Sequence, residues 1–252
     1  MKVNQTVARD AYADIADRYD RFERADDAMA PFFRRLFDAH RVRRVLDCAC
    51  GTGRDLVLFH ALGREVVGTD LSEAMLAQAR RRLAETSLAI ELRRADYREL
   101  PSQLSVPFDA VTCLSTSIAH MRNEAEVIRA FRSMRDVLRD DGVLVLSQGT
   151  TDAQWREQPR FLLAANTPEV SRLFVIDYHG RGATYHVVDI CRGGADEGLR
   201  VWSVAYALML LRDDQERLLR EAGFRSVEFF GSYRGEQYDK NTSRRLIAVA
   251  RK

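Results

Sequence analysis

The sequence of 252 residues contains no uninterrupted run of about 18 apolar residues, the length that a membrane-spanning helix requires. Its opening segment, MKVNQTVARDAYADIADRYD, also lacks the apolar core of a secretory signal peptide. We therefore expect neither a membrane span nor an export signal, and we predict a cytoplasmic protein.

Cysteine pairs and an excess of charge are absent as well. The four cysteines form no CxxC pair and no Cys/His zinc spacing, and no cluster of acids and histidines has metal-ligand spacing. We therefore expect buried free thiols and no catalytic metal. The formal net charge is only +2, and no aromatic residues interleave the basic runs at 41–44, 79–83 and 92–94. Such runs are typical of solvated ends of helices and strands, so we expect no nucleic-acid partner.

Strand-like and helix-like segments alternate along most of the chain. Buried strands separated by helices of about 10–15 residues predict a parallel sheet with helices on both faces. The prediction is an α/β fold with a Rossmann-like, doubly wound, seven-stranded and mostly parallel sheet. Strands are expected at 43–49, 64–70, 87–96, 108–116, 142–148, 226–233 and 243–252, and helices at 54–62, 72–85 (with Ser72 as N-cap), 124–139 and 213–224 (ending at Gly223).

Two regions depart from this alternation. Apolar residues recur at helical spacing over the first 40 residues, including Tyr12 and Tyr19, and predict an N-terminal helical lid. Beyond residue 148, three strand-like runs follow one another with glycine-containing breaks and no helix between them. They lie at 172–178, 183–191 and 199–211. They predict an antiparallel β insert at about 149–211, within one domain that spans 1–252.

The stretch VLDCACGTGRDL at 45–56 carries the strongest functional signal, because open α/β sheets bind ligands beyond the carboxyl end of the first strand. A phosphate-binding P-loop would need a lysine and a hydroxyl residue after Gly53, where Arg54 and Asp55 stand. A dinucleotide fingerprint would need a third glycine at the position of Leu56. Both of these ligand classes are therefore disfavoured.

Two acids beside this loop indicate another ligand. Asp47 sits before the loop and can lie near an ammonium group. Asp70 ends the second strand, and an acid at this distance from the glycines accepts hydrogen bonds from both ribose hydroxyls, while Gly51 and Gly53 allow a close approach of the backbone. A ligand with ribose hydroxyls, an ammonium group and no phosphate describes S-adenosylmethionine (SAM).

At this point the chain resembles the class I SAM-dependent methyltransferases over nearly its whole length. DCACGTG resembles the first motif of that family, and GTDLSEAML resembles the segment with the ribose-binding acid. RRADYREL at 93–100 resembles the segment whose acid faces the adenine amino group, and FDAVTCLSTSIAHM and VLRDDGVLVL resemble the motifs of the fourth and fifth strands. The resemblance implies the class I methyltransferase fold and SAM as cofactor. It implies SAM contacts from Asp47, Ala49, Gly51, Gly53, Asp70, Leu71, Met75, Asp96 and Tyr97.

Within that family the likeness is strongest to glycine N-methyltransferase and related small-molecule enzymes. CLSTSIAHM is similar to the CLGNSFAHL of that group, and AYADIADRYD to its opening QYAD helix. The match implies that Leu114 packs on the adenosine, that His120 approaches the carboxylate end of SAM and that the Tyr12 hydroxyl lies near the transferred methyl group. It also places Tyr19 beside the cofactor and Arg24 within one residue of an arginine that clamps the methionine carboxylate.

These motifs predict in-line methyl transfer to a small amine or amino-acid-like acceptor, with Tyr12 and His120 as catalytic residues and no metal. O- or C-methylation of a natural product, and transfer or cyclisation of the aminocarboxypropyl group of SAM, remain alternatives. The acceptor is a small molecule, and we expect a monomer or homodimer without a membrane partner. The residues predicted to bind the acceptor are Thr116, Tyr178, Arg181 and Tyr206, with Arg156, Arg160 and Arg172 as other possible carboxylate ligands.

Overall fold

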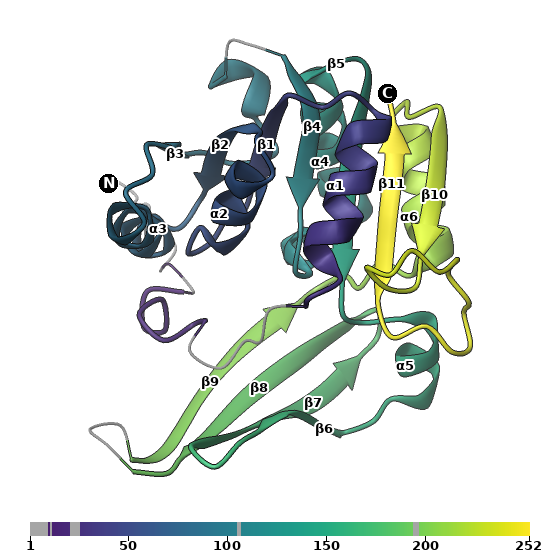
Figure 1. Cartoon of the computed structure of the whole chain (residues 1–252). Coiled ribbons are helices and arrows are strands. Elements are labelled where there is room, and N and C mark those ends of the chain that lie inside the picture. Colours follow the sequence, from purple (N-terminus) through teal and green to yellow (C-terminus); the bar gives the residue numbers. More distant parts are fainter. Residues whose placement is uncertain (1–9, 11, 21–25, 105–106, 194–196) are drawn as a thin grey trace, which may run out of the picture.

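The computed structural model describes residues 10, 12–20, 26–104, 107–193 and 197–252, which form an α/β body and a separate antiparallel sheet (Figure 1). The body is built on a seven-stranded sheet in the order β10-β11-β5-β4-β1-β2-β3, in which only β11 runs against its neighbours. This confirms the predicted mostly parallel sheet. The strands are β1 Arg44–Cys48, β2 Glu65–Asp70, β3 Glu91–Arg94, β4 Phe108–Cys113, β5 Leu138–Gln148, β10 Ser226–Phe230 and β11 Leu246–Arg251.

Helices cover both faces of this sheet because successive residues of each buried strand point to opposite sides. In β1, for example, Val45 packs into one apolar cluster and Leu46 into the other. The first cluster lies under α1 and α2, and the second lies under α4 and α6 (Figure 1). The helices are α1 Met29–Ala39, α2 Arg54–Ala61, α3 Glu73–Glu85, α4 Glu124–Asp136 and α6 Arg212–Glu221, with short 3-10 helices η1 Leu100–Ser102 and η2 Ser117–His120.

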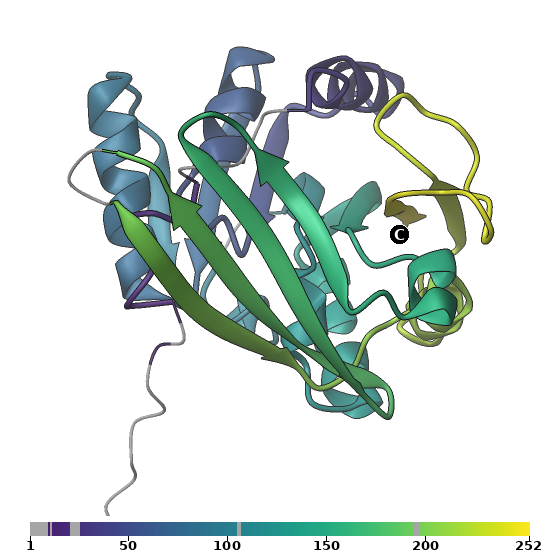
Figure 2. The same ribbon diagram turned by 90° about the horizontal axis from the view of Figure 1, so that it is seen from below.

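The insert forms a four-stranded antiparallel sheet in the order β6-β7-β8-β9. It lies beyond the edge of the body at which the parallel strands end (Figures 1 and 2). The three predicted strands are present, but the insert also contains α5 and a fourth strand that were not predicted. Strand β6 has the sequence FLLAAN, which has no β-branched residue to favour a strand. The insert elements are α5 Asp152–Glu157, β6 Phe161–Asn166, β7 Val170–His179, β8 Gly182–Cys191 and β9 Gly198–Tyr206.

Of the helical segments predicted in the first 40 residues, the one around Phe32 and Phe37 is confirmed as α1, whereas the one around Tyr12 and Tyr19 is not a regular helix. Residues 12–20 form consecutive turns, with one α-type hydrogen bond from Ala16 N to Tyr12 O at 3.0 Å, and α1 is the first regular helix among the described residues. A segment this short has too few backbone hydrogen bonds to offset the cost of starting a helix, and it relies on contacts with the body instead.

The cysteines agree with the prediction of buried free thiols. All four are unpaired, and Cys48, Cys50 and Cys113 are buried, while Cys191 is half-buried. No helix in the described ranges is long and apolar enough to cross a membrane. Residues 10, 12–20, 26–104, 107–193 and 197–252 contain no group of three or more His, Cys, Asp or Glu side chains placed to hold a metal ion.

Candidate active site

The glycine loop after β1 has an unusual backbone that keeps its centre open. Ala49, Gly51 and Gly53 all have positive φ angles, of 79°, 55° and 79°. The loop is fixed to β2 because the Ala49 and Cys50 amides donate to Thr69 O at 2.7 and 2.9 Å. A Cβ atom at Gly53 would lie 3.1 Å from the Ala79 Cβ, whereas one at Gly51 would meet nothing within 4 Å. Gly53 therefore allows α2 and α3 to pack closely, and Gly51 leaves space where a ligand can approach.

Asp70 closes this loop from the neighbouring strand. Its Oδ2 accepts a hydrogen bond from Gly51 N at 2.8 Å, and its Oδ1 accepts one from Ser72 N at 2.8 Å. Burial raises the pKa of Asp70, while these backbone donors act in the opposite direction. Each carboxylate oxygen keeps a second acceptor site for a hydroxyl donor, as the ribose prediction requires.

Asp47 is a buried acid in surroundings that already contain negative charge. Thr112 Oγ1 donates to its Oδ1 at 2.8 Å. Burial, followed by the neighbouring charge of Asp55, raises the pKa of Asp47 well above its usual range. A cation bound here would offset the repulsion between these carboxylates, so the site electrostatically favours a positively charged ligand.

The loops after β3 and β4 form the part of the site that is predicted to hold the adenine. Asp96 forms a bidentate pair with Arg98, whose Nε lies 3.0 Å from both carboxylate oxygens. Partial burial acts to raise the pKa of Asp96, but the hydrogen bonds and charge of Arg98 outweigh it, and the net shift is downward. Tyr97 OH donates to Ser117 O at 3.0 Å and joins the two loops, and Leu114 is buried beside them. Leu71, by contrast, is exposed after β2.

A cluster of aromatic residues lies beyond these acids. The Tyr12 hydroxyl hydrogen-bonds to His120 Nε2 at 2.7 Å. The His120 ring lies 5.1 Å from the Tyr206 ring at the end of β9, and the Tyr12 ring lies 5.8 Å from the Tyr19 ring. Burial raises the pKa of Tyr12 and of Tyr206 and lowers the pKa of His120. At neutral pH the cluster is therefore uncharged.

Two anchors hold residues 12–20 across the glycine loop. At one end, Asp10 accepts from Ser72 Oγ at 2.6 Å and from Tyr12 N at 3.0 Å. At the other end, Asp20 pairs with Arg82 at 2.8 Å and also accepts a hydrogen bond from Thr52 Oγ1. The Asp10 anchor joins this segment to the start of α3, and the Asp20 anchor joins it to both the loop and α3. Together they explain how a segment without regular helix brings Tyr12 to His120.

A cavity of about 690 Å³ lies between the body and the inner face of the insert sheet. Ser115 after β4 and Arg54 at the start of α2 form part of its wall on the body side, and Arg172 and Phe174 of β7 form part of its wall on the insert side. Arg172 is buried and pairs with Asp189 through hydrogen bonds of 2.7 and 2.8 Å. Of the residues predicted to bind the acceptor, only Arg172 lines this space, and neither Tyr12 nor His120 does. We call it the acceptor cavity. Its other lining residues are Asp26, Asp27, Met29, Ala30, Asp55, Leu58, Ala164, Ala165, Asn166, Tyr233 and Arg245.

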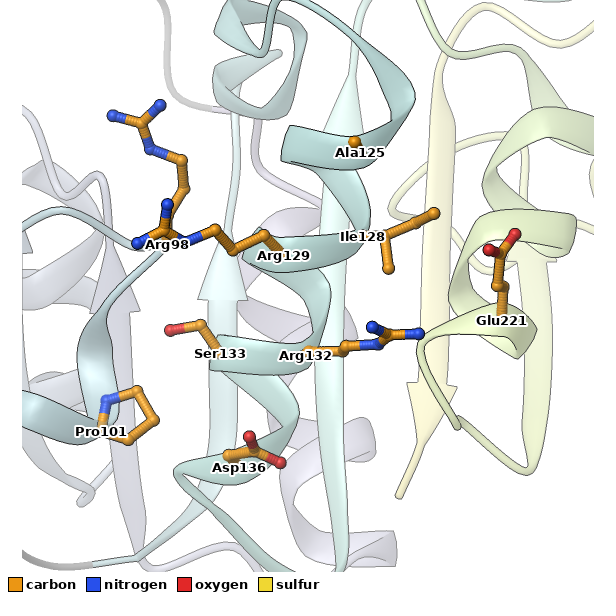
Figure 3. Close-up of a pocket in the computed structure, with 9 residues that line it drawn as sticks. All are labelled: Arg98, Pro101, Ala125, Ile128, Arg129, Arg132, Ser133, Asp136 and Glu221. Atoms are coloured by element: carbon orange, nitrogen blue, oxygen red, sulfur yellow. The ribbon is translucent and has the colours of Figure 1, made fainter.

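A second cavity, of about 440 Å³, lies on the side of α4 that faces α6 and η1 (Figure 3). Its lining includes Arg98, Arg129 and Arg132 together with the acids Asp136 and Glu221. None of the predicted site residues lines it, and two of its arginines already pair with carboxylates: Arg98 with Asp96 and Arg129 with Glu99. We do not assign it a role in catalysis.

The predicted acceptor-binding residues do not all meet at one place. Tyr206 joins the Tyr12–His120 pair, and Thr116 lies in the loop after β4, where its Oγ1 accepts from Gly149 N at 3.3 Å. Arg181 instead pairs with Glu124 at 2.6 Å and Asp214 at 2.9 Å, and the Tyr178 hydroxyl donates to Pro159 O at 3.2 Å. Arg24 lies outside the described residues.

Several residues that shape the site were not predicted. Asp10, Asp20 and Arg82 anchor the N-terminal segment, and Tyr233 and Arg245 line the acceptor cavity from the loop between β10 and β11 and its end. These contacts join residues far apart in the chain, and no spacing of residues in the sequence predicts them. Arg54 and Asp55 are the exception, because their place directly after the glycine loop, at the start of α2, could have indicated a position in the site.

The neutral state of His120 leads to a prediction about pH. Because burial lowers its pKa, the unfolded chain binds a proton more readily than the folded chain, and this group favours folding fully only above its ordinary pKa of about 6.5. As the pH falls through and below that value, the contribution is lost. We expect the urea concentration at the midpoint of unfolding to decrease when the pH is lowered from 7.5 to 5.5. In His120→Gln this decrease should be smaller. An equal decrease of the midpoint in the unaltered protein and in His120→Gln would contradict the buried, neutral state assigned to His120.

Comparison with known proteins finds similar methyltransferases. A family model described as a methyltransferase domain matches residues 45–142, from β1 into β5. A glycine/sarcosine N-methyltransferase of Parasynechococcus marenigrum is 30% identical over 234 residues, which cover 87% of this chain and 77% of the relative. Two solved structures are similar. A sugar N-methyltransferase from Streptoalloteichus is 28% identical, with a TM-score of 0.72 and coverage of 100% and 98% of the two chains. A SAM-bound amino pentose methyltransferase from Micromonospora echinaspora is 26% identical, with a TM-score of 0.67 and coverage of 90% and 92%.

Proposed function

The chain belongs to the class I SAM-dependent methyltransferases, and from that premise we propose that it methylates the nitrogen of a small-molecule amine that also carries an acidic group. SAM is the cofactor, and it supplies a methyl group already activated for displacement by its bond to a sulfonium. The relatives named above act on glycine and sarcosine or on sugars, by their names, and all of these are small molecules.

The residues present fit SAM. Asp47 is a buried carboxylate crowded by Asp55, and it is suited to the ammonium group. Asp70 retains acceptor sites for the two ribose hydroxyls, and Asp96 is held ionised by Arg98 as an acceptor for the adenine amino group. Asp47 lies near the carboxyl end of β1, Asp70 ends β2 and Asp96 follows β3, so the three acids lie in sequence along one edge of the sheet. That order matches the order of the polar groups along the cofactor.

The aromatic cluster supplies alignment and keeps water away from the reacting atoms. Tyr12, held by the anchors at Asp10 and Asp20, presents its hydroxyl to His120 at 2.7 Å. The uncharged rings of Tyr12 and Tyr206 can face a cation without repelling it. In this proposal Tyr12 and His120 position the methyl donor and the acceptor.

The observation that favours nitrogen over oxygen as the acceptor is the environment of His120. A hydroxyl acceptor needs a general base with a pKa near the working pH, usually a histidine oriented by a carboxylate. Burial lowers the pKa of His120, and its described hydrogen-bond partner is the Tyr12 hydroxyl. A neutral amine carries its own lone pair and needs no such base.

The reaction can be tested by incubating the protein with SAM and a panel of amines, phenols and carboxylates, and by following their masses. We expect an amine to gain one methyl group while S-adenosylhomocysteine accumulates. Methylation of phenols alone would refute the choice of nitrogen. Methylthioadenosine in place of S-adenosylhomocysteine would refute methyl transfer and would favour the aminocarboxypropyl alternative.

The acceptor cavity favours a molecule larger than glycine. Its volume of about 690 Å³ lies in the range typical of sites for drug-sized ligands, roughly 300–1,000 Å³, and glycine would leave most of it filled with water. The wall contains both arginines (Arg54, Arg172 and Arg245) and acids (Asp26, Asp27 and Asp55). This mixture suits an acceptor with an amine at one end and a carboxylate or phosphate at the other. We expect such acceptors to be turned over faster than glycine or sarcosine.

Arg245 provides a direct test of the acidic group. Arg245→Gln is expected to raise the KM for an acidic amine about 10-fold, with kcat and the Kd for SAM little changed, because a charge-assisted hydrogen bond is lost from acceptor binding only. Arg244 is the adjacent arginine, is exposed and is not among the lining residues, so Arg244→Gln is a matched control. Equal effects of the two substitutions would count against the acidic group.

A further inference from the structure

Two consecutive residues of the loop after β4 lie in the left-handed backbone region. Ser115 has a φ angle of 57°, and Thr116 has one of 70°. In this region the Cβ atom lies too close to the following carbonyl oxygen, so glycine and asparagine occupy it more readily than serine or threonine. The segment CLGNSFAHL of the glycine N-methyltransferase group has Gly and Asn at these two places, whereas this chain has Ser and Thr. The loop therefore carries backbone strain that a glycine would relieve.

The end of the neighbouring strand β5 holds this loop in its strained conformation. Thr116 N donates to Ser147 O at 2.8 Å, and Ser115 N donates to Ser147 Oγ at 3.2 Å. Ser147 is buried, and its Oγ also accepts a hydrogen bond from the Tyr233 hydroxyl at 3.2 Å. Gly149 N donates to Thr116 Oγ1 at 3.3 Å. Unfavourable backbone conformations persist where the surroundings determine them in this way, and they cluster at active sites and ligand-binding sites.

The three consecutive hydroxyl side chains of this region have different surroundings. Thr116 Oγ1 accepts its hydrogen bond from the backbone, and Ser117 Oγ donates to Leu114 O at 2.8 Å. Ser115 is exposed and lines the acceptor cavity, and its Oγ has no hydrogen-bond partner among the described residues. Of the three hydroxyls, the one of Ser115 is therefore free to donate a hydrogen bond to a molecule in the cavity, or to accept one from it.

Ser115 also connects the acceptor cavity with the aromatic cluster. The 3-10 helix η2 begins two residues after Ser115 and ends at His120, whose Nε2 hydrogen-bonds to the Tyr12 hydroxyl. A 3-10 helix rises about 2 Å per residue, so a single turn separates the loop from the Tyr12–His120 pair. An acceptor that is held in the cavity and extends its amine toward this pair would therefore lie beside Ser115.

We propose that the Ser115 hydroxyl selects the acceptor by a hydrogen bond to a polar group, such as a hydroxyl, beside the nitrogen that is methylated. An acceptor without such a group would cover the Ser115 hydroxyl and leave it unpaired, so purely aliphatic amines should be disfavoured. The strain of the loop is then the cost of placing a hydroxyl at this point of the cavity wall. This inference rests on the proposed function, because it requires that the acceptor occupies the acceptor cavity.

Two substitutions separate the hydroxyl of Ser115 from the strain. Ser115→Ala removes the hydroxyl and keeps the Cβ atom, whereas Ser115→Gly removes both. With the acceptor that gains a methyl group in the panel described above, both variants should raise the KM roughly 3- to 10-fold and leave the Kd for SAM unchanged. Only Ser115→Gly relieves the strain, so its melting temperature should rise by about 2–4 °C. A merely structural role would not weaken acceptor binding in a variant that is more stable.

Ser87 is the matched control, because it is an exposed serine with a φ angle of 54°, follows α3 and does not line the acceptor cavity. Ser87→Gly should raise the melting temperature as Ser115→Gly does, and neither Ser87→Gly nor Ser87→Ala should change the KM. An unchanged KM in Ser115→Ala would overturn the proposal, and so would an equal rise in Ser87→Ala. If the panel identifies a phenol as the acceptor, the same comparison is made with that phenol. An error in the choice of nitrogen is then distinguished from an error about Ser115.

Discussion

Asp70→Ala is expected to weaken SAM binding by roughly 2–3 kcal/mol, or about 30- to 150-fold in Kd. The substitution removes the acceptor proposed for the ribose hydroxyls. It also leaves the amides of Gly51 and Ser72 without the partner that each has at 2.8 Å. Because Gly51 belongs to the cofactor loop, the loop should lose order together with its ribose contact. Isothermal titration calorimetry with SAM and with S-adenosylhomocysteine measures the loss directly.

Two further variants separate the charge of Asp70 from its structural role. Asp70→Asn keeps one side-chain acceptor for a backbone amide, so it should bind SAM with an affinity between those of the alanine variant and the unaltered protein. Glu85→Ala removes an exposed acid from the end of α3 and should change nothing. Unchanged SAM affinity in Asp70→Ala would refute the assignment of the ribose ligand.

The parallel body could be predicted from the sequence because its strands are buried on both faces. Runs such as RVLDC and EVVGTD have apolar residues at consecutive positions in their centres, and each is followed by a helix whose start is marked, as Ser72 marks α3. The insert was harder to predict in detail. Its strands have one face toward the acceptor cavity, and β6 contains only Phe, Leu, Ala and Asn, which a helix accepts as well. The periodicity of apolar residues alone does not distinguish a strand from a helix in so short a run.

The part of the candidate site that lies within one sequence motif could be predicted. The part formed by segments far apart in the sequence could not. Asp47, Gly51 and Asp70 lie within 24 residues of one another, and their spacing alone indicates a cofactor site at the carboxyl ends of two neighbouring strands. The acceptor cavity instead combines α1, α2, β6, β7 and the loop before β11. Arg181 illustrates the difficulty: its type and position in the insert suit a carboxylate, yet Glu124 and Asp214 from two helices of the body engage its guanidinium.

Tyr12→Phe is expected to lower kcat about 10- to 100-fold while the Kd for SAM changes by less than about threefold. The hydroxyl is the only group removed, and its described partner is His120 Nε2 at 2.7 Å. Its loss leaves a buried ring nitrogen without that partner and frees the rings to move, which costs alignment in the transition state more than it costs binding. Single-turnover rates with SAM in excess, combined with calorimetry, separate the two effects.

Tyr238→Phe is the appropriate control for the loss of a tyrosine hydroxyl, because Tyr238 donates to Asp152 Oδ2 at 2.7 Å and lines neither the glycine loop nor the acceptor cavity. It should keep kcat. Tyr206→Phe should fall between the two, since the Tyr206 ring packs against His120 but the hydrogen bond to His120 Nε2 comes from Tyr12. If Tyr12→Phe weakened SAM binding as much as turnover, Tyr12 would be a cofactor ligand only. If neither changed, the hydroxyl would have no part in aligning the methyl group, and the N-terminal segment would act on the reaction through its anchors at Asp10 and Asp20 alone.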